Sequence, residues 1–213
     1  MVSKRGKYIV LESGEGFGKT THLKGITEFL KEKKVPHIVT REPGGTKIGI
    51  SIRDVLLNPD LKEPLPLTKL LLYSGDRVEH SHYIIIPNLE KGVNVVGDRS
   101  HISTRVYQHA EGVNSEDINQ IEKIINVVPI DLAIIIDGDS RQGLKNAGLN
   151  VEEFGKPDTF ERKTLDFHER LREGYLKEIA QNPDRYIKVP YIHENPRAMQ
   201  QEIRRHIKER LKI

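Results

Sequence analysis

Short apolar runs typical of β-strands alternate along the chain with longer segments that have helical spacing. The run 132–136 is apolar throughout, which is typical of a strand buried on both faces of a parallel sheet. Strands alternating with helices predict a three-layer α/β fold, in which a doubly wound, five-stranded parallel sheet is flanked by helices. The predicted strands are 7–12, 37–41, 93–97, 132–136 and 185–189. The predicted helices are 19–33, 48–57, 68–91, 115–126, 160–181 and 196–211, together with one after Arg99 that contains residues 101–108.

The composition excludes several kinds of site. The 213 residues suffice for one domain, and no repeat or low-complexity tract divides them. The absence of Cys excludes a disulfide scaffold, a thiolate zinc site and a Cys nucleophile. Lys and Arg total 34 against 31 Asp and Glu, so the chain has no polyanion-binding composition, although a few basic residues can still converge on a small anion.

The sequence carries no targeting or membrane signal. The first apolar stretch has four residues, 8–11, fewer than the roughly 7–15 of a signal peptide or the roughly 18 of a membrane span. We therefore expect a soluble, cytoplasmic protein with no membrane partner. The Gly-rich, weakly patterned stretch 138–157 predicts a mobile flap inside the single domain 1–213, and we expect a lid at about 138–163.

A glycine-rich segment joins the first predicted strand to the first helix. The phosphate-loop pattern G-x-x-x-x-G-K-[ST] is met at Gly18, Lys19 and Thr20, while Ser13 replaces its first Gly. Lys19 is expected to reach the terminal phosphates of ATP, and Thr20 to offer a hydroxyl to Mg²⁺. The alternative is a glycine-rich turn without a ligand. The predicted ATP-binding residues are Ser13, Gly14, Glu15, Gly16, Phe17, Gly18, Lys19, Thr20 and Thr21.

Charged residues follow two other predicted strands, at the edge where parallel sheets bind ligands. Arg41 follows the second strand, and its planar guanidinium suits a phosphate. Asp98 and Arg99 end the third strand, where the carboxylate can hold Mg²⁺ and the guanidinium can clamp a phosphate. The alternative for this pair is an internal ion pair.

Two further pairs are suited to a base or a sugar. Tyr73 and Arg77 lie four residues apart on a predicted helix, so they share a face on which a base can stack and be read. Tyr107 and Gln108 offer a ring and an amide on the helix after Arg99. The alternative for the first pair is a core Tyr beside a solvent-exposed Arg.

In this order the segments resemble the thymidylate kinase family over about residues 7–190. The loop is similar to E-G-x-D/E-G-x-G-K-[ST]-T, and R-E-P-G-G-T is matched in full at 41–46. Three further elements, I-R-x-x-L-L, L-L-[FY]-x-A-D-R-x-x-H and D-R-x-x-x-S-T-x-A-Y-Q, have matching residues Ile52, Arg53, Leu56, Leu57, Leu71, Leu72, Tyr73, Asp76, Arg77, His80, Asp98, Arg99, Ser103, Thr104, Tyr107 and Gln108.

The resemblance implies a P-loop NTPase fold and transfer of the γ-phosphoryl group of ATP to dTMP with Mg²⁺, giving dTDP and ADP for dTTP synthesis. It also implies a homodimer. Arg41, Arg99 and Arg53 would bind the dTMP phosphate. Tyr73 would stack on thymine and Arg77 would bind its carbonyl edge. The remaining implied contacts are Tyr107 and Gln108 at the base and sugar, Glu15 near the 3′-hydroxyl, and Thr20 and Asp98 at the metal.

The resemblance is weaker in the lid. Some members of the family carry an Arg inside the phosphate loop, where this chain has Phe17, and others supply basic residues from the lid. The lid Arg positions of the family are Asn146 and Thr159 here, so we expect a slow enzyme or a substitute among Arg141, Lys145 and Lys156. The predicted catalytic residues are Lys19, Asp98, Arg99, Arg141 and Lys145.

Three alternatives remain open at this stage. The chain can be a kinase of the same fold with another or a broader nucleoside monophosphate range. It can be a nucleotide-binding regulator with little turnover. It can also bind nucleic acid through its basic C-terminal run 204–212, although the apolar spacing there favours a solvated amphipathic helix, and we expect no nucleic-acid partner.

Overall fold

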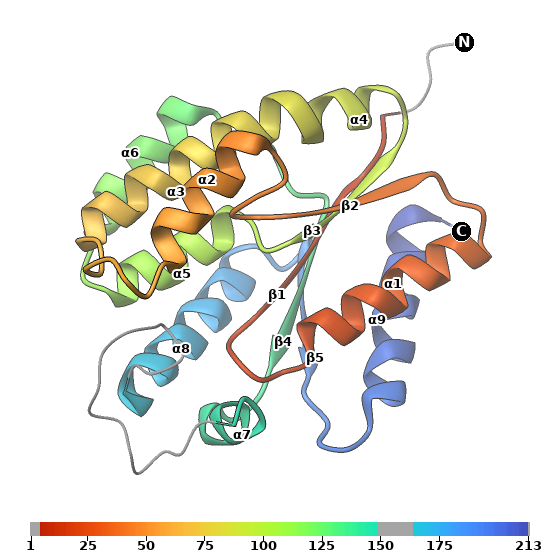
Figure 1. Cartoon of the computed structure of the whole chain (residues 1–213). Coiled ribbons are helices and arrows are strands. Elements are labelled where there is room, and N and C mark those ends of the chain that lie inside the picture. The colour runs from red at the N-terminus through yellow and green to blue at the C-terminus, as the bar shows by residue number, and fades with distance from the viewer. Residues whose placement is uncertain (1–4, 149–163, 213) are drawn as a thin grey trace.

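The computed structural model describes residues 5–148 and 164–212. Its strands form one parallel sheet in the order β2-β3-β1-β4-β5, with helices on both sides (Figure 1). The predicted doubly wound α/β fold is confirmed, and each predicted strand lies within one residue of the observed one. The strands are β1 (Tyr8–Ser13), β2 (His37–Arg41), β3 (Asn94–Asp98), β4 (Leu132–Asp137) and β5 (Tyr186–Pro190).

Alternate residues of β1 enter two separate cores. Ile9 and Leu11 pack with α1 (Lys19–Glu32) and α9 (Pro196–Leu211) on one face of the sheet. Tyr8 and Val10 pack with α5 (His101–Ala110) and α8 (Leu165–Gln181) on the other. The helices that follow the neighbouring strands β1 and β3 therefore cover opposite faces. This reversal opens a crevice at the carboxyl ends of β1 and β3, where doubly wound folds bind ligands.

The predicted helix 68–91 is divided into three parts. It consists of α3 (Pro66–His80), a π-helical turn over Ser81–Ile85 and α4 (Ile86–Glu90). Pro87 lies at the start of α4, where its missing N–H group would otherwise break an α-helical hydrogen bond. The wider π turn absorbs that break, so the segment continues as one rod along the top of Figure 1.

Side-chain caps fix the starts of several helices. Thr46 caps α2 (Lys47–Leu57), Ser100 caps α5, and Asn114 caps α6 (Ser115–Ile125). Thr164 caps α8, which therefore begins at Leu165. The helix start predicted at residue 160 lies outside the described residues.

One helix was not predicted. α7 (Ser140–Asn146) lies within the stretch interpreted as a flap, and the Asp139 side chain caps it by accepting a hydrogen bond from the Gln142 N–H group at 3.1 Å. With few apolar residues, the segment has no helical periodicity to detect, although Ser140, Gly143 and Leu144 of the helix are buried. The rest of the predicted lid, 149–163, lies outside the described residues.

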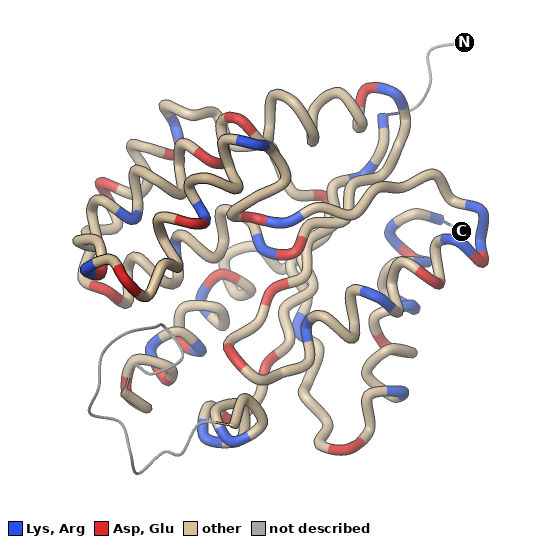
Figure 2. Tube along the Cα trace, in the orientation of Figure 1, with Lys and Arg blue, Asp and Glu red and all other residues tan. Residues whose placement is uncertain are grey.

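The C-terminal helix is amphipathic, as expected. Met199, Ile203 and Ile207 of α9 are buried in the core, and Arg205 forms ion pairs with Glu202 and Glu209 on the outer face. Figure 2 shows both basic and acidic residues along this helix. Among the described residues, no helix combines the length and the apolar character that a membrane span requires.

Candidate active site

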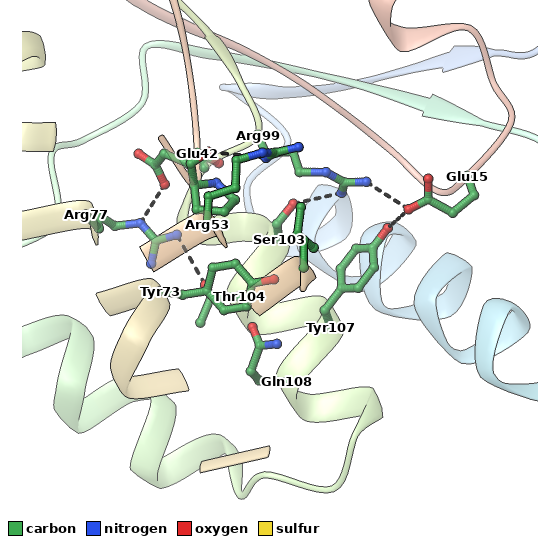
Figure 3. Close-up of a pocket in the computed structure, with 13 residues that line it drawn as sticks. Glu15, Glu42, Arg53, Tyr73, Arg77, Arg99, Ser103, Thr104, Tyr107 and Gln108 are labelled. Carbon is green, nitrogen blue, oxygen red and sulfur yellow. Dashed lines mark hydrogen bonds and ion pairs between the residues drawn. The ribbon is translucent and has the colours of Figure 1, made fainter. Parts of the chain in front are cut away.

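A cavity of about 340 Å³ lies at the carboxyl ends of β1, β2 and β3 (Figure 3). The residues after these three strands contribute one wall, and α2 and α3 contribute the other. All but one of the residues predicted for the acceptor nucleotide line it, namely Glu15, Arg53, Tyr73, Arg77, Arg99, Tyr107 and Gln108. Figure 3 shows Arg53 and Arg99 on one side and Gln108 on the opposite side. The cavity is therefore cationic at one end and amide- and ring-lined at the other.

A buried ion pair forms the floor near α3. The Arg77 Nε group donates to Glu42 Oε2 at 2.8 Å, and Arg77 Nη2 donates to Thr104 Oγ1 at 3.2 Å. Arg77 Nη1 has no hydrogen-bond partner among the described residues, although it is buried. Burial would raise the pKa of Glu42, but Arg77 and the hydrogen bond from His80 outweigh burial and lower that pKa to about 2. The pair therefore leaves one guanidinium donor of Arg77 without a protein acceptor among the described residues.

Arg99 is the centre of a second, partly buried network. Its Nη2 donates to Glu15 Oε1 at 2.9 Å, and the Tyr107 hydroxyl donates to the same oxygen at 2.8 Å. Burial alone would raise the pKa of Glu15, but Arg99 and the Tyr107 hydrogen bond lower it. Glu15 is thus a carboxylate, and it orients one cation and one phenol toward the cavity (Figure 3).

Glu12 supports this network from beneath. Its carboxylate is fully buried and accepts hydrogen bonds from Ser100 at 2.7 Å, Ser103 at 2.6 Å and Tyr175 at 3.1 Å. Ser103 in turn accepts from Arg99 Nη1 at 3.1 Å. The backbone of Arg99 is left-handed, with φ of 70°, a conformation that costs a non-Gly residue about 1–3 kcal/mol and persists only where the surroundings impose it. The Glu12 network supplies that constraint.

The glycine-rich loop has the backbone of an anion site. Gly16 and Gly18 have φ values of 75° and 71°, which glycine adopts without strain. Within the described part of the chain, the backbone N–H groups of residues 14–21 donate to no protein acceptor. They surround the N-terminus of α1, where such groups bind phosphate. Ser13 is the last residue of β1 and has no left-handed backbone, so a side chain is tolerated where the phosphate-loop pattern has Gly.

Lys19 lies at the start of α1 and pairs with Asp98 across the sheet edge, with Nζ 2.6 Å from Oδ1. Asp98 therefore pairs with Lys19, and Arg99 with Glu15, so the alternative of an internal Asp98–Arg99 pair is wrong. Thr20 and Thr21 are exposed in the first turn of α1. One carboxylate and one hydroxyl fit Mg²⁺, which binds few protein oxygens and keeps several waters. No cluster of three metal-ligating side chains exists among the described residues.

Some predicted residues lie outside the cavity. Arg41 ends β2 beside Asp98 of β3, but its side chain is exposed and does not line the cavity. Arg141 and Lys145 are exposed on α7, also away from the cavity. Phe17 of the loop has a buried side chain, so only its backbone can contact a phosphate. Lys156 lies outside the described residues.

Sequence reasoning assigned no role to several residues that complete the site. Glu42, Ser100 and Thr104 line the cavity, and Glu12 lies beneath it. All four lie within or beside the motifs quoted above, and that position was the signal in the sequence that could have identified them. A carboxylate in a motif is ambiguous because sequence does not show whether it faces a ligand or an Arg.

The fold and the loop define a P-loop nucleotide-binding protein of the NTPase type. The thymidylate kinase family profile matches residues 11–203. A thymidylate kinase of Carboxydothermus hydrogenoformans is 43% identical over 81% of this chain and 84% of its own length, and one of Desulforapulum autotrophicum is 41% identical over 85% and 82%. The crystal structure of thymidylate kinase from Ehrlichia chaffeensis superposes with a TM-score of 0.74 at 27% identity, covering 96% of this chain and 99% of that one.

The chain belongs to the thymidylate kinase family. It is accordingly a transferase, an ATP-dependent nucleoside monophosphate kinase, and the resemblance on which the sequence prediction depended is confirmed.

The Glu42–Arg77 pair predicts a pH dependence of stability. At pH 7, Glu42→Gln should lower the free energy of unfolding by about 3 kcal/mol, because it leaves Arg77 buried without a counter-ion. The pKa of Glu42 is lower in the folded chain, at about 2, than its ordinary value of 4.5. Its contribution is therefore present above pH 4.5 and is lost as the pH falls toward 2.

Urea denaturation of the wild-type protein and of Glu42→Gln between pH 7 and pH 2 measures the difference between their free energies of unfolding. It should shrink steadily below about pH 4.5. A difference independent of pH would show that the pair does not set the pKa of Glu42. The control is Glu90→Gln, a change at an exposed carboxylate, which should alter the free energy of unfolding by less than about 0.5 kcal/mol at pH 7.

Proposed function

We propose that this chain carries out the thymidylate kinase reaction in the cavity described above, transferring the γ-phosphoryl group of ATP to dTMP and releasing dTDP and ADP. The observation that carries the proposal is the adjacency of two sites at one sheet edge. A loop with unpaired N–H groups lies beside a cavity lined by the buried guanidinium of Arg77 and the half-buried guanidinium of Arg99. Phosphoryl transfer needs such positioning and charge neutralisation rather than a covalent residue.

The cavity is suited to a nucleoside monophosphate. Arg99 and Arg53 lie on its cationic side, and we assign them to the phosphate of dTMP, with Arg41 approaching from the end of β2. The unpartnered Nη1 of Arg77 suits a carbonyl oxygen of thymine, against which Tyr73 stacks. Tyr107 and Gln108 then lie along the base and sugar, and Glu15 lies near the 3′-hydroxyl.

The loop is suited to the donor phosphates. The N–H groups of residues 14–21 and the ammonium of Lys19 form the cradle, and Thr20 and Asp98 would hold Mg²⁺. When bound, Mg²⁺ neutralises charge on the β- and γ-phosphates. When ATP binds, the ammonium of Lys19 leaves Asp98 and pairs with the phosphates. The phosphate of dTMP is itself the nucleophile and is already ionised at neutral pH, so no general base is assigned.

A second copy of the chain is the proposed partner. Leu67, Leu71 and Val78 form an apolar row along α3 with exposures of 53%, 56% and 44%, and Ile48 and Val55 of the adjacent α2 are also exposed. Several exposed apolar side chains on two neighbouring helices are typical of a protein interface. We propose that two copies pack through α2 and α3 as a homodimer.

Lys19→Ala tests the phosphate-loop assignment. Loss of the ammonium should lower turnover by roughly 10²-fold or more, because charge on the terminal phosphates is then uncompensated. Lys24→Ala, at an exposed position on the same helix, should keep full activity. A coupled assay of ADP formation with dTMP, dUMP, dCMP, dGMP and UMP measures both variants.

The same nucleotide panel separates the remaining alternatives. A preference for dTMP supports the proposal. Comparable rates with several nucleotides would indicate a kinase of broader range. Binding of ATP and dTMP without ADP formation would indicate a regulator. Full activity in Lys19→Ala would contradict the loop assignment itself.

The lid supplies the remaining cationic charge in this proposal. A positioned Arg at the transferred phosphoryl group can contribute ~10³–10⁵ in rate. One of Arg141→Ala, Lys145→Ala and Lys156→Ala should therefore reduce turnover much more than Lys177→Ala, a change at an exposed position on α8. Unchanged turnover in all three variants would exclude these residues.

The dimer surface is tested by Leu71→Glu. A buried carboxylate at the centre of the apolar row should convert the dimer to a monomer in sedimentation velocity experiments. Ile124→Glu, at a side chain that is 80% exposed on α6, should stay dimeric. A wild-type protein that sediments as a monomer would contradict the proposed homodimer.

A further inference from the structure

The short helix α7 lies directly against the backbone of the phosphate loop. A Cβ atom added to Gly16 would lie 1.7 Å from the carbonyl oxygen of Gly143, and one added to Gly143 would lie 2.5 Å from the carbonyl oxygen of Glu15. These distances are far below van der Waals contact. Only glycine on both sides allows the helix and the loop to approach this closely.

Phe17 fills the space beneath this contact. Its ring is only 6% exposed and packs edge-to-face against Tyr191, which follows β5, with the ring centroids 5.1 Å apart. A Cβ atom added to Gly138 would lie 2.4 Å from the ring, and one added to Gly143 would lie 2.7 Å from it. Phe17 therefore joins three segments, namely the loop, the base of α7 and the segment after β5.

Asn146 completes the attachment with hydrogen bonds. Its Nδ2 donates to the Gly16 carbonyl oxygen at 3.1 Å and to the Tyr191 hydroxyl at 2.8 Å. Gln142 Nε2 donates to Asn146 Oδ1 at 2.7 Å, which fixes the amide orientation. In a trans peptide the carbonyl and the following N–H group point in opposite directions. Holding the Gly16 carbonyl toward α7 therefore turns the Phe17 N–H group away from it.

We propose that Phe17 is a positioning residue that anchors α7 to the phosphate loop and thereby presets the loop backbone for the phosphates of ATP. This inference depends on the proposed assignment of ATP to the loop. A preset loop avoids the entropic cost of ordering a glycine-rich segment when the nucleotide binds. The residue that replaces a loop arginine thus acts through α7, and Asn146 acts with it.

The test compares Phe17→Leu with Phe29→Leu. Both rings belong to the same core beneath the sheet, but Phe29 lies on α1 away from the loop. The first readout is amide hydrogen exchange in α7 (Ser140–Asn146) of the ligand-free enzyme. The second is the KM for ATP beside the KM for dTMP. Phe17→Leu should speed exchange in α7 and raise the KM for ATP about tenfold, whereas Phe29→Leu should do neither.

A second pair of variants tests whether the effects arise from a general loss of stability. Gly143→Ala should have the same two effects, because its methyl group pushes α7 away from the loop. Gly75→Ala, whose methyl group would meet only Ile52 at 3.8 Å, should have neither.

The outcomes separate the anchor from the assignment of ATP. Equal exchange in α7 for Phe17→Leu, Gly143→Ala and their controls would overturn the anchor. Faster exchange with an unchanged KM for ATP would show that Phe17 anchors α7 but would overturn the presetting of the loop. The placement of ATP on the loop is tested separately, by Lys19→Ala.

Discussion

Three ion pairs across the carboxyl ends of neighbouring strands hold the active site together. Lys19 pairs with Asp98, Arg99 with Glu15, and Arg77 with Glu42, each at 2.9 Å or less. In every case the two partners come from different strand-to-helix connections or from α3. Each pair therefore fixes one connection relative to another, and the cavity exists only while the parallel sheet keeps β2, β3 and β1 adjacent.

These ion pairs also compensate the positive charges of the site in the free protein. A pocket for phosphates needs cations, yet a buried guanidinium without a counter-ion is strongly unfavourable. The carboxylates of Glu15 and Glu42 compensate the cations in the free protein while leaving specific donors, above all Nη1 of Arg77, without partners among the described residues. The near-neutral overall charge thus coexists with a strongly charged site, because acidic and basic residues are paired locally.

Much of the molecule was predictable from the sequence. The strands followed from short apolar runs, because a strand buried on both faces consists mostly of apolar residues. The loop at 13–21 and the residues Tyr73, Arg77, Tyr107 and Gln108 followed from motifs, because phosphates and bases demand particular groups at fixed spacing. The sequence failed at α7, which has no apolar periodicity and is stabilised by its contacts with the phosphate loop. It also missed the buried role of Glu12, because a motif does not reveal what a carboxylate faces.

The sequence by itself therefore determined the fold class, the phosphate loop and most of the side chains that line the cavity. Local spacing and residue chemistry were sufficient for these features. Only the tertiary structure decided which charges pair, that Arg41 stays outside the cavity while Arg77 lies in its floor, and that Phe17 is buried beneath α7. The physical reason is that pairing and burial are contacts between segments distant in sequence, which the packing of the sheet and helices brings together.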